Sequence, residues 1–284
     1  MPTVDQFQSV FLSTVREPFA YAEPSLERVT IICDLEEQAA ATFTESVKQL
    51  VGSHGDRATW RTVTRDKSDT VEALLGLVES DSPDLVVSYR NVHSTAWTWP
   101  HSLGRHLDIL TQATDTAVLV LPHPNDAEHF AKAVSPVSRV MAVSGHLAGE
   151  GALVNQAAAY AGDGGTVLLA HVEDDATFER YMNAVSKIPG IDTEPARSAI
   201  LAQLLKEPGD YVTAVRNGLA AAGVQRSVES LTETGHHVDQ YRQLIEANNV
   251  QLVVLNTKDD GQDAMHGVAY PLAIELRHIP LLML

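Results

Sequence analysis

Short apolar segments recur along the chain and alternate with segments that have the apolar spacing of amphipathic helices. Residues 28–34 (RVTIICD), 117–121 (AVLVL) and 251–256 (QLVVLN) are examples of these apolar segments. Strands that are apolar along their whole length are typical of parallel sheets buried on both faces, and a helix provides the crossover between two such strands. The pattern therefore predicts an α/β fold with doubly wound parallel sheets.

The alternation runs twice along the chain, and both runs end with a helix and a short apolar strand. The expected strands are 28–34, 58–64, 84–88, 117–121, 138–144, 166–172, 226–232, 251–256 and 280–284. The expected domains are an N-terminal arm (1–27), domain 1 (28–124), a linker (125–137) and domain 2 (138–284). Domain 1 has no strand–helix unit between residues 51 and 58, so we expect it to be smaller by one element.

Composition excludes several classes of protein. The 284 residues include 37 acidic and 20 basic side chains, a formal net charge of −17, and this charge repels a phosphate backbone. No apolar run is long enough to cross a membrane, and the first residues do not resemble a signal peptide. The single cysteine, Cys33, cannot form an internal disulfide. We therefore expect a cytoplasmic protein that binds neither nucleic acid nor a membrane.

Several segments resemble, in order, the universal stress protein family. Residues 28–34 are similar to the first strand of that family, and 166–174 (TVLLAHVED) are similar to its second strand, which commonly ends in His-Val. Residues 58–89 and 233–257 resemble the helix-then-strand segment that leads into the nucleotide loop. The resemblance implies two universal-stress-like domains in tandem, related by a pseudo-twofold axis, with the strands 117–121 and 280–284 paired across it. The chain would then be an intramolecular pseudo-dimer, and a further homodimer stays open.

Family members that bind ATP have a loop of the pattern G-x2-G-x9-G-[ST], whose glycines bring backbone amides close to the phosphates. The loop at 88–105 retains only Gly104, with Arg105 at the hydroxyl position. The loop at 256–268 retains only Gly267, with Val268 at the hydroxyl position and three aspartates nearby. We therefore expect both phosphate loops to be degenerate and no cofactor to be bound, with ATP as the alternative.

The resemblance also assigns adenine or ribose contacts to Asp34, after the first strand, and to the backbone of His171 and Val172. Each assignment has a structural alternative. Asp34 is also well placed to cap the helix that begins near Glu36, which is the interpretation we favour. His171 and Val172 can equally be an ordinary strand end.

The sequence contains no recognised motif for metal binding or for catalysis. His93, His101 and His106 share one loop and His236-His237 begin a helix, but the chain has no H-E-x-x-H and no paired cysteines. There is no G-x-S-x-G either, and the glycine-rich run at 145–151 is not a dinucleotide-binding motif. We therefore expect no metal and no catalytic residue. The aromatic residues Tyr89, Trp97 and Trp99 either stack on a ligand or pack over their own sheet.

Together these observations predict a non-catalytic stress-response or regulatory protein that acts through protein partners or an unidentified small ligand. An ATP-binding regulator with a modified pocket is the first alternative. The second alternative is an enzyme on the related nucleotide-hydrolase architecture. Such an enzyme needs a phosphate loop and a general acid or base, and the sequence shows neither.

Overall fold

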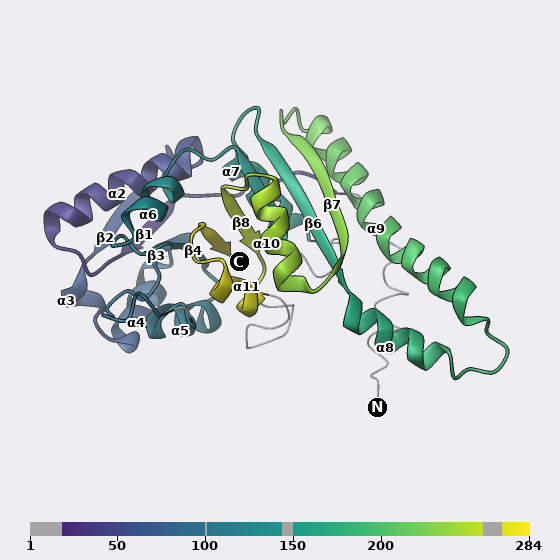
Figure 1. Ribbon diagram of the computed structural model, residues 1–284. Helices are drawn as coiled ribbons and strands as arrows, with labels where there is room; N and C mark the ends of the chain where they lie inside the picture. Colours follow the sequence, from purple (N-terminus) through teal and green to yellow (C-terminus); the bar gives the residue numbers. More distant parts are fainter. Residues whose placement is uncertain (1–18, 100, 144–149, 258–268) are drawn as a thin grey trace.

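The computed structural model describes residues 19–99, 101–143, 150–257 and 269–284. All strands of this part belong to one nine-stranded sheet with the order β2-β1-β3-β4-β9-β8-β5-β6-β7 (Figure 1). The strands are β1 (Arg28–Ile32), β2 (Thr59–Val63), β3 (Leu85–Tyr89), β4 (Ala117–Leu121), β5 (Arg139–Val143), β6 (Thr166–Asp174), β7 (Ser227–Gly235), β8 (Leu252–Leu255) and β9 (Leu281–Met283). Each of the nine expected strands is found, and the predicted α/β class is confirmed.

Helices cover both faces of the sheet. In the first half they are α2 (Glu37–Val51), the 3-10 turn η1 (Gly52–Gly55), α3 (Arg65–Ser68), α4 (Val71–Asp81) and α5 (Arg105–Ala113). In the rest of the chain they are α6 (Ala127–Ala133), α7 (Gly151–Ala161), α8 (Asp175–Val185), α9 (Thr193–Ala221), α10 (His237–Ala247) and α11 (Ala269–Glu275). Helices α2 and α6 lie on one face of the first four strands, and α4 and α5 lie on the other (Figure 1).

All neighbouring strands are parallel except β4 and β9, which pair antiparallel with Leu119 opposite Leu282. This pair, which we call the seam, joins the four strands of the first half to the five of the second. The predicted pairing of residues 117–121 with 280–284 is thus confirmed, as is the missing unit in the first half. The domain boundaries themselves stay predictions.

The core of the sheet explains why its strands were apparent in the sequence. The side chains of β4, β8 and β9 are almost all buried, and Leu119 and Leu282 are fully inaccessible at the seam. Burial of a leucine of this kind stabilises the fold by about 1.5–3 kcal/mol. The seam is therefore part of one continuous hydrophobic core.

Two helical predictions differ from the structure. The residues predicted as a linker contain α6, whose Phe130 stacks on Phe43 of α2 with ring centroids 5.6 Å apart. The sequence pattern predicts two helices, 196–206 and 211–222, on either side of Pro208, whereas the structure has the single helix α9. Proline usually ends a helix because it removes a backbone donor, but the buried face formed by Tyr211, Val212, Val215 and Leu219 keeps the second part of α9 on the sheet.

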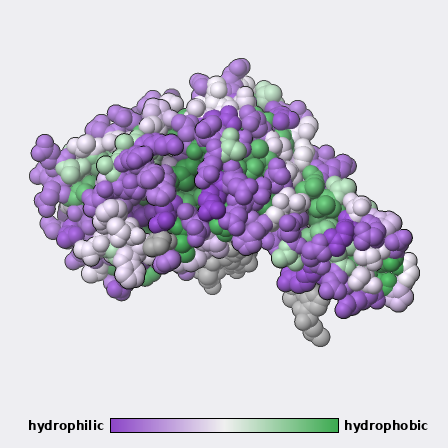
Figure 2. Space-filling model, viewed as in Figure 1, coloured by the Kyte–Doolittle hydropathy of each residue, from purple (hydrophilic) through white to green (hydrophobic). Residues whose placement is uncertain are grey.

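Helix α8 and the beginning of α9 project away from the sheet (Figure 1). This projection exposes several large aromatic and aliphatic side chains: Tyr181, Ile188, Ile191 and Ile200. Figure 2 shows hydrophobic green areas among the hydrophilic surface of this part of the molecule. Within the described residues, no helix has both the length and the apolar character needed to span a bilayer.

Candidate functional site

The candidate site lies where β1 and β3 end. Strand β1 pairs with β2 on one side and with β3 on the other, and β3 pairs with β4 on its far side. The chain therefore leaves β1 toward β2 and leaves β3 in the opposite direction, toward β4. Such a switch point opens a crevice at the carboxyl ends of the strands, and ligands of doubly wound sheets bind there. Asp34 follows β1 and Tyr89 ends β3 at this crevice.

The carboxylate of Asp34 is bound by groups of its own chain. The Tyr89 hydroxyl donates to Oδ1, while the backbone N–H of His93 donates to Oδ2 at 3.1 Å. Arg65 donates to Oδ2 at 3.2 Å, and the backbone N–H of Asp34 donates to the Tyr89 hydroxyl at 3.0 Å. Both carboxylate oxygens therefore accept hydrogen bonds from the chain itself. The bonds from Tyr89 and His93 connect the end of β3 and the loop that follows it to the end of β1.

Asp34 does not cap helix α2, so the favoured sequence interpretation was wrong. The N-cap of α2 is Glu36, and no side-chain hydrogen bond caps this helix. Asp34 turns toward β3 because Tyr89, fully buried, places a hydroxyl donor beside it. Burial opposes ionisation of Asp34, but the hydrogen bonds from Tyr89 and Arg65 outweigh it, and its pKa lies below the ordinary value of 3.8.

We expect Asp34→Asn to lower the free energy of unfolding by about 1.5–3 kcal/mol, the range for hydrogen bonds to charged groups. A carboxyl whose pKa is lowered by folding stabilises the protein above its ordinary pKa, and this contribution disappears as the pH falls through the folded-state pKa. The difference between wild type and Asp34→Asn should therefore be full at pH 7 and shrink below pH 3.8.

Urea unfolding at pH 7 and at acidic pH checks this expectation. Arg65→Gln provides the matched control, because Arg65 is 64% exposed and its ion pair with Asp34 contributes little. Equal stability of Asp34→Asn and wild type at pH 7 would contradict the structural role of Asp34.

Aromatic side chains fill the space beside Tyr89. The Trp97 ring stacks on His123 with centroids 5.2 Å apart, and His123 meets the Tyr89 ring edge-on at 5.1 Å. Burial lowers the pKa of His123, which favours its neutral form. Trp99, grouped with these residues in the sequence, is 69% exposed. Of the two sequence interpretations, packing of Tyr89 and Trp97 within their own chain is the one this arrangement matches.

The histidines of the 89–106 loop do not form a three-ligand metal cluster. The rings of His93 and His106 lie 4.8 Å apart, but His93 Nε2 bonds to Ser68 Oγ at 3.0 Å and His106 Nε2 donates to the Asp69 carbonyl at 3.0 Å. His101 is exposed. His93 and His106 therefore hold the loop and the start of α5 against the end of α3.

Gly104 serves the backbone of this loop. Its φ is +97°, and a Cβ added there would lie 2.6 Å from the Cα of Asn91. The two chain segments approach this closely because Asn91 N–H donates to the Leu103 carbonyl at 2.7 Å. Only glycine fits such a position, whether or not a phosphate binds nearby.

In the second half, the backbone of Val172 is occupied by side chains of α10. Its N–H donates to the Tyr241 hydroxyl at 3.1 Å, and its carbonyl accepts from His237 Nε2 at 2.9 Å. His171 is buried, with its Nε2 3.5 Å from Glu173 Oε2. The backbone N–H and carbonyl of Val172, which the resemblance assigned to adenine, thus have internal partners. Gly267, Val268 and the three neighbouring aspartates lie outside the described residues.

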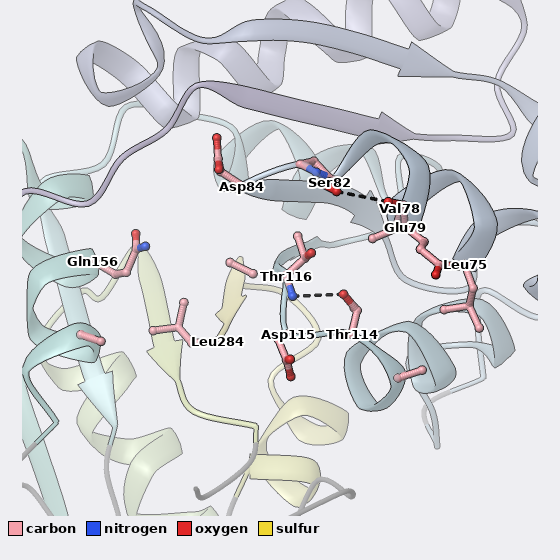
Figure 3. Close-up of a pocket in the computed structure, with 14 residues that line it drawn as sticks. Leu75, Val78, Glu79, Ser82, Asp84, Thr114, Asp115, Thr116, Gln156 and Leu284 are labelled. Carbon is pink, nitrogen blue, oxygen red and sulfur yellow. Dashed lines mark hydrogen bonds between the residues drawn. The ribbon is translucent and has the colours of Figure 1, made fainter. Parts of the chain in front are cut away.

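A pocket of about 920 Å³ lies at the opposite end of β3 and β4, between the two halves (Figure 3). Its lining includes the carboxylates of Glu79, Asp84 and Asp115, and none of the described lining residues is a lysine or arginine. Asp84 accepts the backbone N–H groups of Glu27 and Arg28, both at 2.8 Å. This pocket is therefore unfavourable for a phosphate group.

Sequence reasoning missed two polar features at the seam. Arg90, 4% exposed, donates to the carbonyls of Ala273 and Leu276, the latter at 2.9 Å, and so joins the end of β3 to the end of α11. Burial lowers its pKa to about 9, so it remains charged at neutral pH. The second feature is a cluster of Asp126, His129 and His278, whose members are far apart in the sequence.

The fold is similar to solved universal-stress-type structures. A Pseudomonas aeruginosa UCBPP-PA14 protein described as a universal stress protein has 12% identity and a TM-score of 0.52, over 92% of this chain and 93% of that one. A functionally unknown protein of P. aeruginosa PAO1 has 11% identity and a TM-score of 0.50, over 92% of each chain. No protein-family model and no curated protein matches the sequence. At these identities the likeness concerns the fold.

Proposed function

We propose that this chain is a tandem protein of the universal stress type that regulates or binds without catalysis and does not use ATP. One observation carries the proposal: the groups that would receive a nucleotide are bonded within the chain in both halves. These groups are the carboxylate of Asp34 and the backbone of Val172. A nucleotide would have to replace these internal bonds, and each buried group left without a partner costs about 1–3 kcal/mol.

The role of Gly104 supports the loss of the first phosphate loop. This glycine matches the last glycine of the family pattern, but the close approach to Asn91 already accounts for it. Its helix, α5, begins with Arg105 and has no side-chain cap. The hydroxyl donor of a phosphate site is thus absent from the first turn of α5.

The strand order supports the tandem arrangement. In each half the first strand lies between the second and a later one, as β1 lies between β2 and β3 and β5 lies between β6 and β8. Two parallel sheets related by a twofold axis meet through an antiparallel pair, which is the relation of β4 to β9. The chain then contains its own dimer interface.

The state of the single cysteine, Cys33, supports the absence of catalysis by a thiolate nucleophile. Cys33 is fully buried, and burial raises the pKa of its thiol, so little thiolate forms.

Action through protein contacts is supported by the projection of α8 and α9, since exposed apolar side chains grouped on one element are typical of interaction surfaces.

Calorimetry with Mg-ATP tests the proposal on the whole chain. We expect the wild type to bind more weakly than about 1 mM, which corresponds to about −4 kcal/mol. Val268→Ser restores one hydroxyl and should gain less than about tenfold, because a single hydrogen bond contributes about 1 kcal/mol. Micromolar binding by the wild type would refute the proposal. Tight binding by Val268→Ser alone would show that the second loop is intact apart from this side chain.

A further inference from the structure

Three potential metal ligands meet where the segment between the two halves approaches the seam. Asp126 precedes α6, His129 lies in its first turn, and His278 lies in the turn that leads into β9. The ligand atoms of all three lie within 4.8 Å of one another. The cluster thus joins two parts of the chain that are distant in the sequence.

Both imidazoles direct Nδ1 toward the same carboxylate. His129 Nδ1 lies 2.8 Å from Asp126 Oδ1 and 2.9 Å from Oδ2, and His278 Nδ1 lies 3.5 Å from Oδ2. The two rings are 3.7 Å apart, centroid to centroid, and inclined by 35°. The three side chains are between 29% and 50% exposed, so an ion can reach them from solvent.

Hydrogen bonding alone explains only part of this arrangement. His129 and Asp126 form an ordinary contact between residues three apart at a helix start. His278 is at the limit of hydrogen-bond distance from the same carboxylate, yet its ring lies against that of His129. An ion between the three side chains would bond both nitrogens and the carboxylate with small side-chain movements, because its ligands lie about 2.0–2.2 Å from it.

The ligand types indicate which ion fits. Two imidazole nitrogens and one carboxylate suit Zn²⁺, Co²⁺ or Ni²⁺, whereas Mg²⁺ and Ca²⁺ prefer oxygen ligands. Three protein ligands also leave a fourth position for water. The net charge of −17 favours cation binding, and the nearby Arg277 opposes it.

We propose that Asp126, His129 and His278 bind one divalent ion of the Zn²⁺, Co²⁺ and Ni²⁺ class. The bound ion connects α6 to the turn before β9 and so reinforces the seam beside Arg90. This inference is independent of whether the protein binds nucleotides.

The test uses the full chain without a histidine tag, after treatment with a chelator and dialysis. Co²⁺ is titrated by its visible absorption and Zn²⁺ by calorimetry. We expect one ion per chain, a rise in melting temperature with Zn²⁺, and at least tenfold weaker binding in both His278→Asn and Asp126→Asn. Melting of each variant without metal shows whether it is folded.

His236→Asn is the matched control, because His236 is an exposed histidine with an aspartate, Asp239, three residues away, but in the described part of the chain it belongs to no group of three potential ligands. Its ion affinity should equal that of the wild type. The proposal is overturned if the wild type binds no ion, if His278→Asn or Asp126→Asn loses less than tenfold, or if His236→Asn weakens binding to the same extent as they do.

Discussion

A chain that ends at Ile279 is expected to lose its folded state. Strand β9 lies in the middle of the sheet, paired with β4 on one side and β8 on the other. Leu281, Leu282 and Met283 are all at most 1% exposed. Burying three such side chains contributes about 5–9 kcal/mol, which is comparable with the whole stability of many proteins.

The truncation also removes backbone partners and exposes strand edges. Thr257 N–H donates to the Leu284 carbonyl at 2.8 Å, and Leu284 N–H donates to the Leu255 carbonyl at 3.0 Å. Without β9, the apolar edges of β4 and β8 become exposed and are free to pair with other chains. We therefore expect aggregation as well as unfolding, measured by size-exclusion chromatography and circular dichroism.

Single substitutions measure how much individual side chains of β9 contribute to the free energy of unfolding. Leu282→Ala should lower the free energy of unfolding by about 2–5 kcal/mol, because it leaves a cavity at the seam. Ile188→Ala is the control, because Ile188 is 50% exposed on the projection and its truncation should change stability by at most about 0.5 kcal/mol. A soluble, monodisperse truncated chain with unchanged melting would show that β9 does not hold the sheet together.

Gly104→Ala is expected to have the second largest effect, a loss of about 3 kcal/mol or more in stability. A Cβ at this position meets the backbone Cα and N of Asn91, at 2.6 and 3.0 Å, and backbone atoms cannot move aside cheaply. The φ of +97° adds strain for any residue with a side chain. The expected loss occurs in the absence of any nucleotide.

Gly76→Ala provides the control in the same half of the chain. Gly76 lies in helix α4, and no atom lies within 4 Å of a Cβ added there. This variant should gain about 0.5–1 kcal/mol, because alanine favours the helix. Denaturant unfolding compares the two variants. Equal stability of Gly104→Ala and wild type would contradict the backbone role of Gly104 and leave phosphate binding as the reason for this glycine.

The strands were predictable because a parallel sheet buried on both faces leaves a local signature. Residues 117–121 and 280–284 are apolar throughout, and this property alone locates two strands that need a partner on each side. Helix α6 was missed because proline and polar residues precede it, and Phe130 packs on a residue distant in sequence. Helix α9 was predicted as two helices because proline locally disfavours a helix. Tertiary packing overrides this local effect at Pro208.

The candidate site was only partly predictable. The sequence located Asp34 and Val172 at strand ends, because strand ends follow from the apolar pattern. The sequence could not show that Tyr89 bonds to Asp34 or that Tyr241 bonds to Val172. These contacts depend on how helices and loops pack over the sheet. The cluster containing His278 is hidden for the same reason.

The central claim is that the crevice between β1 and β3 is filled by the chain itself, and fluorescence of Trp97 tests it most directly. Trp60→Phe with Trp99→Phe leaves Trp97 as the single tryptophan, stacked on His123 within the crevice. The same chain with Asp34→Asn is the positive control, because releasing the loop should shift the emission. We predict no change in Trp97 emission up to millimolar Mg-ATP. A saturable change at micromolar Mg-ATP would contradict the claim.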